Sequence, residues 1–186
     1  MSKPDLIDAA SKTLALCAVA LELFVLVTLL LAIASLFSQH ARVWLRGLRG
    51  LFSGMELWLA FTVALVAFLG SLFFSEYADF IPCRLCWFQR IAMYPLPLLL
   101  GIATLRRDRA IRVYAIPMAL VGAAISIYHY QLERFPSQTH LSCELDSPCT
   151  TVWFWKFHYI SLPLMALSGF LLIVWLTWIA GQSERP

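Results

Sequence analysis

Long apolar runs, separated by short polar segments, are the main pattern along this chain. Five runs are evident, at residues 13–37, 57–75, 87–105, 113–130 and 159–181. A helix needs about 20 mostly apolar residues to cross the hydrocarbon core of a bilayer, and a helix satisfies its own backbone hydrogen bonds there. We therefore predict an all-α integral membrane protein with five transmembrane helices and no internal repeat.

The composition of the chain excludes several classes of protein. Of its 186 residues, 61% are hydrophobic and only 13% are charged, whereas soluble domains are about 45–50% apolar and about 25% charged. One soluble core cannot bury so much apolar surface. We therefore exclude a water-soluble enzyme, a disordered chain and a nucleic-acid-binding protein, and we expect the lipid bilayer to surround the helices.

The first apolar run resembles a secretory signal peptide in hydrophobicity, but its flank argues against cleavage. The segment before it holds two lysines and two aspartates, so it lacks a basic start. Glu22 interrupts the run, and a carboxylate at that depth is costly unless it has a partner or lies near the interface. We expect a retained helix in which Glu22 snorkels or pairs locally, with a polar contact inside the bundle as the alternative.

The arginines predict which helix ends share a side of the membrane. Seven of them lie in two loops, between the first and second runs and between the third and fourth: Arg42, Arg46, Arg49, Arg106, Arg107, Arg109 and Arg112. The other loops are nearly balanced in charge. By the positive-inside rule, these two loops and the C-terminus face the cytoplasm. The N-terminus and the loops at 76–86 and 131–158 then face the periplasm or outside.

Four of the five cysteines fall in the two outward segments. Cys83 and Cys86 form a Cys-x-x-Cys motif where the third run begins, and Cys143 and Cys149 lie in the longest loop. Outside the cytoplasm, paired cysteines are usually oxidised, and two pairs on one side suggest a relay of thiol–disulfide exchange. Four cysteines could also bind zinc, but the second pair is spaced unlike a zinc knuckle, so we predict no metal.

The position of the Cys-x-x-Cys motif suggests a reactive pair. Unsatisfied amides and the positive end of the helix dipole favour a thiolate at a helix start. Arg90 lies four residues after Cys86, one turn along the same face, where a cation favours a Cys86 thiolate or an anionic acceptor. No haem or flavin motif is visible, so a lipid-soluble quinone is the simplest acceptor of two electrons. Snorkelling of Arg90 to lipid headgroups is the alternative.

The residues around this motif resemble a known family. Pro82-Cys83-Arg84-Leu85-Cys86-Trp87-Phe88-Gln89-Arg90-Ile91, followed by Met93-Tyr94-Pro95-Leu96, is similar to the motif of the disulfide bond formation protein B (DsbB) family, nearest to its BdbC-like branch. Phe88 stands where that branch commonly has tyrosine. Tyr128-His129-Tyr130 with Glu133 resembles the segment before the second cysteine pair of that family. Its last-span signature resembles Cys149 followed by Phe157, Ile160, Pro163 and Phe170.

The resemblance implies a quinone-dependent thiol oxidase that reoxidises a DsbA-like thioredoxin-fold oxidase, with ubiquinone or menaquinone as cofactor. By motif, Cys83 and Cys86 match the quinone-proximal pair, with Cys86 and Arg90 against the quinone. Cys143 and Cys149 match the pair that meets the soluble partner. The likeness covers residues 57–181 as a four-helix bundle. Residues 1–56 would add a tail, an extra N-terminal transmembrane helix and a basic cytoplasmic loop, and residues 182–186 a cytoplasmic tail.

His129 ends the fourth run at about the depth of Cys86, and we include it in the quinone site as a hydrogen-bond donor or proton relay. An interfacial histidine beside two tyrosines is the alternative. Two other functions stay open. A vitamin K epoxide reductase-like protein shares the helices and cysteine pairs, but there the loop cysteines precede the Cys-x-x-Cys motif. A non-catalytic membrane subunit would hold static disulfides and would not need Arg90 beside Cys86.

Overall fold

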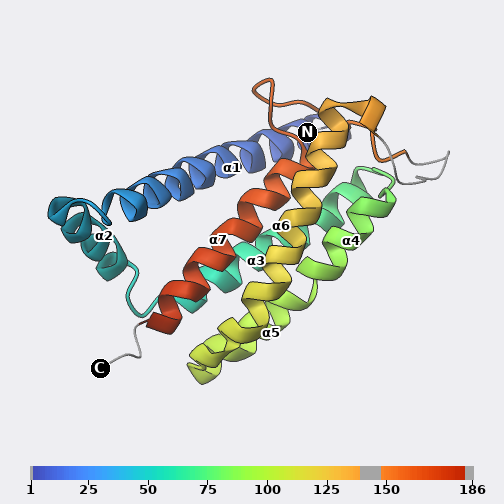
Figure 1. Ribbon diagram of the computed structural model, residues 1–186. Coiled ribbons are helices and arrows are strands. Elements are labelled where there is room, and N and C mark those ends of the chain that lie inside the picture. Colours follow the sequence, from blue (N-terminus) through green and yellow to red (C-terminus); the bar gives the residue numbers. More distant parts are fainter. Residues whose placement is uncertain (1, 139–147, 183–186) are drawn as a thin grey trace.

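The computed structural model describes residues 2–138 and 148–182, and these residues are mostly helical. The helices, labelled in Figure 1, are α1 (Lys3–Ala34), α2 (Gln39–Leu51), α3 (Glu56–Leu72), α4 (Arg84–Met93), α5 (Pro95–Arg106), α6 (Arg112–Arg134) and α7 (Leu162–Gln182). A π-helical turn, Phe73–Tyr77, continues α3, and 3-10 turns at Arg109–Ile111 and Pro136–Gln138 flank α6. The prediction of an all-α membrane fold is confirmed.

Within the described residues, five stretches are long and apolar enough to cross a membrane: Lys3–Ala34, Glu56–Tyr77, Arg84–Arg106, Arg109–Arg134 and Leu162–Gln182. They match the five predicted spans, with shifted ends. The first begins at Lys3 because Ser2 and Asp5 form a capping box. The last begins at Leu162 rather than 159, because the chain before it turns back through two residues with positive φ, Phe157 and His158.

The segment between the first and second spans is a helix, α2, where we expected a basic loop. Ala41 and Leu45 are buried on one face of α2, whereas Arg42 and Arg46 are exposed on another. Apolar and basic residues that each recur at intervals of three or four make an amphipathic helix, which suits the membrane interface. We predicted a loop because the segment is rich in arginine. The arginines Arg42 and Arg46 are nevertheless four residues apart, which is the interval of one face of a helix.

Helices α3, α6 and α7 and the α4–α5 pair form a four-helix bundle (Figure 1). The third span is interrupted at Tyr94, where α4 ends and α5 begins with Pro95. Proline lacks the N–H that would continue the helix, and it suits the first position of a new one. The Cys-x-x-Cys motif therefore lies at one end of the bundle, with Cys83 as the N-cap of α4 and Cys86 in its first turn.

Small residues allow the bundle helices to approach closely, as in other membrane helix pairs. Ala60 on α3 and Ala115 on α6 are fully buried. Gly122 of α6 lies against Phe170 of α7, so closely that a Cβ at residue 122 would lie 2.2 Å from the aromatic ring. The α6–α7 pair is therefore fixed by the absence of a side chain at Gly122.

Helix α1 contacts α7 near the N-terminus and diverges from the bundle toward α2 (Figure 1). Edge-to-face contacts join Phe24 of α1, Phe52 after α2 and Trp175 of α7, with ring centroids 4.8–5.6 Å apart. Glu22 accepts a hydrogen bond of 2.9 Å from Ser168 Oγ of α7. Glu22 therefore makes a polar contact inside the bundle, and our expectation of snorkelling or local pairing is wrong.

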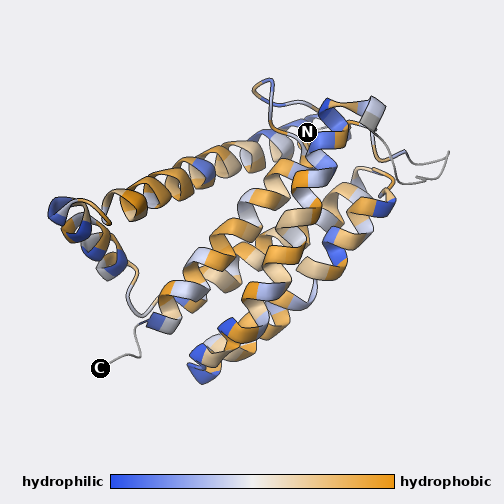
Figure 2. Cartoon of the chain, in the orientation of Figure 1, coloured by the Kyte–Doolittle hydropathy of each residue, from blue (hydrophilic) through white to orange (hydrophobic). Residues whose placement is uncertain are grey.

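Charged residues collect at the helix ends, while the helix bodies are hydrophobic (Figure 2). Two arginines reach the C-terminal end of α7. Arg49 donates a hydrogen bond of 2.9 Å to Gln182 Oε1, and Arg112 donates one of 2.7 Å to the carbonyl oxygen of Gly181. Cations suit a helix C-terminus because they offset its dipole. The two arginine segments therefore lie at one end of the bundle, as their shared sidedness requires.

We predict that Gly122→Ala destabilises the bundle, because the added methyl group would overlap the ring of Phe170. Overpacking of this kind typically costs about 1–3 kcal/mol. Gly47→Ala on α2 is the matched control, since nothing lies within 4 Å of its Cβ position and alanine is the better helix former. Thermal unfolding of both variants in mild detergent, followed by circular dichroism, measures the difference. Equal unfolding temperatures would contradict the close α6–α7 contact.

Candidate functional site

Cys83 and Cys86 lie where an extended segment turns into α4. Cys83 is the N-cap residue, with extended backbone angles (φ −73°, ψ 171°), and its Sγ accepts a hydrogen bond of 3.3 Å from the Cys86 N–H. Pro82 favours an extended backbone at Ile81, the residue before it, so the helix does not continue backward beyond the motif. The Sγ atoms of Cys83 and Cys86 are 2.7 Å apart, and neither residue is in a disulfide. The helix start therefore holds the two sulfurs in contact.

His129 reaches this pair from α6. Its Nε2 lies 3.6 Å from Cys83 Sγ, and its Nδ1 lies 3.3 Å from Nε2 of Gln89 on α4. The amide nitrogen of Gln89 can only donate, so Nδ1 of His129 accepts and Nε2 carries the ring proton. His129 therefore donates a hydrogen bond to the sulfur of Cys83.

These donors give Cys83 the thiolate character of the pair. The thiol of Cys86, whose Sγ lies 2.7 Å away, is the largest cause. Together with the donor of His129 it outweighs burial and lowers the pKa of Cys83. We expected the thiolate at Cys86, beside Arg90. The geometry instead favours the thiolate at Cys83, because the Cys86 thiol and Nε2 of His129 both lie within hydrogen-bond distance of its sulfur.

Cys86 faces a cavity of about 360 Å³ with mostly apolar walls, supplied by α1, α3, α4 and α7. Gln89 and Arg90 bring polar groups to the same cavity. Pockets of about 300–1,000 Å³ that combine apolar walls with a few polar groups are typical small-molecule sites. Cys83 is not among the lining residues of this cavity, so only Cys86 borders it, whereas both cysteines line the smaller cavity described below.

Arg90 is held against aromatic rings at the edge of this cavity. Its guanidinium lies 5.2 Å from the centre of the Trp87 ring and 5.9 Å from that of Tyr94, both within cation–π range. Its Nη2 donates a hydrogen bond of 3.3 Å to the carbonyl oxygen of Ser71 on α3. A guanidinium has five N–H donors, and this bond uses one of them. The geometry suits a donor to a ligand in the cavity better than a headgroup anchor.

Cys149 is disulfide-bonded and only 1% exposed. It belongs to one buried cluster with Cys83, Leu85 and Leu132. Cys143, with which we expect it to pair, lies outside the described residues. We expect this loop pair to meet the soluble partner through one of its cysteines, and the burial of Cys149 makes Cys149 the less accessible of the two candidates to attack from outside.

Glu133 is a site residue that we had noted only as part of a resemblance. It is 8% exposed, and its Oε2 has no hydrogen-bond partner among the described residues. It lines a second cavity of about 90 Å³ together with Cys83, Cys86 and His129. The signal in the sequence is the interval of four residues from His129 to Glu133, which places both side chains on one face of α6.

A metal ion does not fit the sulfurs as they are placed. The ligand atoms of Cys83, Cys86 and His129 all lie within 4.8 Å of one another. Two thiolates bound at about 2.3 Å to a tetrahedral zinc ion would be about 3.8 Å apart, whereas these sulfurs are 2.7 Å apart. The contact instead suits a pair that alternates between dithiol and disulfide.

The structure brings together four of the residues singled out from the sequence. Cys83, Cys86, Arg90 and His129 converge at the start of α4, but they divide between two cavities. Cys86 and Arg90 line the large apolar cavity, whereas His129 lines only the smaller one, behind Cys83. His129 lies at the depth of the cysteine pair, as we expected, but it contacts Cys83 and does not line the large cavity.

The chain is similar to known disulfide formation proteins. Residues 55–180 match the family model described as disulfide bond formation protein DsbB. Disulfide bond formation protein C of Bacillus subtilis is 47% identical over 119 residues, which cover 63% of this chain and 86% of that protein. A Bacillus anthracis relative, named probable disulfide formation protein C 2, is 42% identical over 127 residues, covering 68% of this chain and 90% of the relative. No solved structure matches the chain.

The matched segment contains the four-helix bundle up to residue 180, while α1 and α2 lie before it. It also contains the chemically active residues of the site, which are Cys83, Cys86, Arg90, His129, Glu133 and Cys149. The chain belongs to the DsbB family of disulfide bond formation proteins, and it is a multi-pass membrane oxidoreductase that forms disulfide bonds.

Proposed function

We propose that this chain is a thiol:quinone oxidoreductase that reoxidises a DsbA-like thioredoxin-fold protein. Electrons pass from Cys143 and Cys149 to Cys83 and Cys86, and then to a quinone of the membrane. One observation carries the proposal. The Cys83–Cys86 pair lies between the buried cluster that holds Cys149 and the apolar cavity that holds Arg90.

The first exchange begins at the loop disulfide. Because Cys149 is buried, the thiolate of the partner attacks Cys143, and Cys149 leaves as a thiolate. Cys149 then attacks Sγ of Cys83 in the oxidised motif, which breaks the Cys83–Cys86 bond and leaves a thiolate on Cys86. The second thiol of the partner releases Cys143 from the mixed disulfide. Cys143 then rejoins Cys149 and frees Cys83, so the partner becomes oxidised and the motif reduced.

The large cavity fits a quinone. Its apolar walls suit the ring and an isoprenoid chain, and Arg90 offers donors to a carbonyl oxygen beside Cys86. A bound quinone would accept the two electrons and two protons that the dithiol gives up. Both ubiquinone and menaquinone have this chemistry.

The chain's own residues close the cycle at Cys83. Formation of the Cys83–Cys86 disulfide would give two electrons and two protons to the bound quinone, which would become the hydroquinone. The lowered pKa of Cys83 keeps its sulfur deprotonated for that step. His129 orients the thiolate through the Nε2–H donor. Glu133, at the small cavity with His129 and Cys83, is placed to take up a proton there.

The bundle ends support an orientation in the bacterial cytoplasmic membrane. The arginines of α2 and of residues 106–112 would face the cytoplasm with the C-terminus, by the positive-inside rule. The opposite end, with both cysteine pairs, would face the periplasm or the cell exterior, where the soluble partner resides. Residues 57–181 form the catalytic unit in this proposal, and α1 is an addition to it.

The decisive experiment measures quinone reduction by the purified protein in detergent, with a reduced thioredoxin-fold partner as electron donor. We predict that Cys83→Ser and Cys86→Ser each abolish turnover, because each removes one sulfur of the pair that joins the cluster of Cys149 to the large cavity. Ala110→Ser at the opposite end of the bundle is the matched control. Near-normal turnover in either cysteine variant would remove this pair from the mechanism.

We predict that a partner without its second cysteine is trapped on Cys143, because Cys149 is 1% exposed. The mixed disulfide should be isolated from the wild-type chain and located by peptide mass spectrometry after blocking of free thiols. Linkage to Cys149 or to Cys83 would contradict the proposed order of exchange.

Arg90→Gln should raise KM for quinone by roughly 10- to 100-fold, since a hydrogen bond from a charged group is worth about 1.5–3 kcal/mol. Arg90→Lys should restore part of the loss, because the charge returns without the planar fork. Arg84→Gln is the control, as Arg84 lies on the same helix but does not line the large cavity. Steady-state kinetics with varied quinone measures the effect. An unchanged KM in Arg90→Gln would leave Arg90 without a role in quinone binding.

A further inference from the structure

Helix α1 contributes one wall of the cavity that Cys86 faces. Its four lining residues are Leu14, Cys17, Ala18 and Leu21. They follow the spacing i, i+3, i+4, i+7, which forms one stripe along a helix. Leu16, one residue from Cys17, is 57% exposed and does not line the cavity. Helix α1 therefore has one face toward the cavity and another toward lipid.

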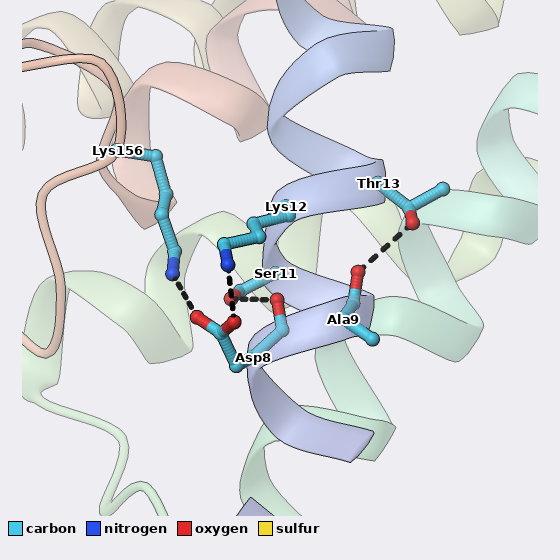
Figure 3. A network of polar contacts seen from close by, with 6 residues as sticks. All are labelled: Asp8, Ala9, Ser11, Lys12, Thr13 and Lys156. Carbon is cyan, nitrogen blue, oxygen red and sulfur yellow. Dashed lines mark hydrogen bonds and ion pairs between the residues drawn. The ribbon is translucent and has the colours of Figure 1, made fainter. Parts of the chain in front are cut away.

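Polar contacts fix α1 at the end of the bundle that carries the cysteines. Lys3 forms an ion pair of 2.6 Å with Asp79, in the segment that leads to Cys83. Asp8 forms another of 2.6 Å with Lys156, in the segment that follows Cys149 (Figure 3). A helix that only anchored the chain in lipid would need neither contact. These two ion pairs set the height of α1 against the site.

Glu22, the residue directly after the last member of the cavity stripe, adds a third polar contact. Its hydrogen bond to Ser168 joins α1 to α7, the helix that supplies part of the opposite cavity wall. A carboxylate inside a membrane is costly without a partner, so this bond also limits rotation of α1 about its axis. The stripe with Cys17 is thereby kept toward the cavity.

The other walls of the cavity come from helices α3, α4 and α7, all within residues 55–180, which match the family model. Helix α1 lies outside that segment. The catalytic groups at the cavity, Cys86 and Arg90, are thus supplied by the shared bundle, and this chain adds a wall of its own.

We propose that α1 is part of the quinone site, and that Cys17 and Ala18 contact the bound quinone and limit the size of the quinone accepted. This inference rests on the proposed function. Ala18 is buried and Cys17 is exposed, which places Cys17 at the open side of the cavity. A larger side chain at residue 17 would narrow the entrance without touching the sulfurs of the Cys83–Cys86 pair.

The first test uses the thiol of Cys17 as a reporter in the oxidised wild-type chain, where the other cysteines are in disulfides. Alkylation by N-ethylmaleimide is followed with and without decylubiquinone, whose ring is fully substituted and cannot add a thiol. At ten times the dissociation constant, bound quinone should slow alkylation roughly 10-fold. The control is Leu16→Cys in a Cys17→Ala background, at the same depth on the lipid face, where no protection is expected. Equal protection of both positions, or of neither, would overturn the proposal.

The second test changes the size of residue 17. Cys17→Phe should raise KM for quinone roughly 10-fold, equivalent to about 1.4 kcal/mol, and Leu16→Phe should leave it unchanged. Reduction of the Cys83–Cys86 disulfide by the partner, measured without quinone, should proceed at the wild-type rate in both variants. A wild-type KM in Cys17→Phe would overturn the role of α1. A wild-type chain that reduces no quinone would instead overturn the proposed function, so the two failures are distinguishable.

Discussion

The hydrogen bond from the Cys86 N–H to Cys83 Sγ is the contact on which the site depends. The first amides of a helix have no partner within it. A sulfur at the N-cap accepts a hydrogen bond from one of them, which caps the start of the helix and favours the thiolate form. The same contact directs Cys83 toward His129 and the cluster of Cys149, while Cys86, inside the first turn, faces the apolar cavity. One helical turn thus gives two neighbouring sulfurs different surroundings.

The bilayer explains why the rest of the bundle is built as it is. Apolar side chains gain nothing by leaving lipid for another helix, so close packing and a few polar contacts must position the helices. Gly122 against Phe170 provides the packing. The bonds from Ser168 to Glu22 and from Arg112 to Gly181 provide the polar contacts. Each of these three contacts joins two segments of the chain. The first two lie beside the walls of the large cavity, and the third lies at the end of the bundle that carries the arginines.

The sequence predicts those features that depend on local spacing. The spans follow from apolar length, and the proximity of Arg90 to Cys86 follows from one helical turn. The partner of Glu22, the burial of Cys149 and the cavity face of α1 depend on how distant segments meet, and spacing contains no such information. His129 illustrates the boundary, because its depth follows from its place in the span, whereas the rotation of α6 decides that it meets Cys83. Helix α2 was missed for another reason, since its arginines suggested a loop although their interval was helical.

Access alone can give the proposed relay its direction. Cys83 is 5% exposed and lies in the cluster of Cys149, so Cys149, once released as a thiolate, is the nucleophile best placed to reach it. Cys86 opens toward a cavity with apolar walls, where water and soluble thiols are excluded and a lipid-soluble acceptor is favoured. A thiolate released on Cys86 therefore meets an electron acceptor before it meets another thiol. Helix α1 strengthens this separation, because it places an apolar face, rather than open lipid, along one side of that cavity.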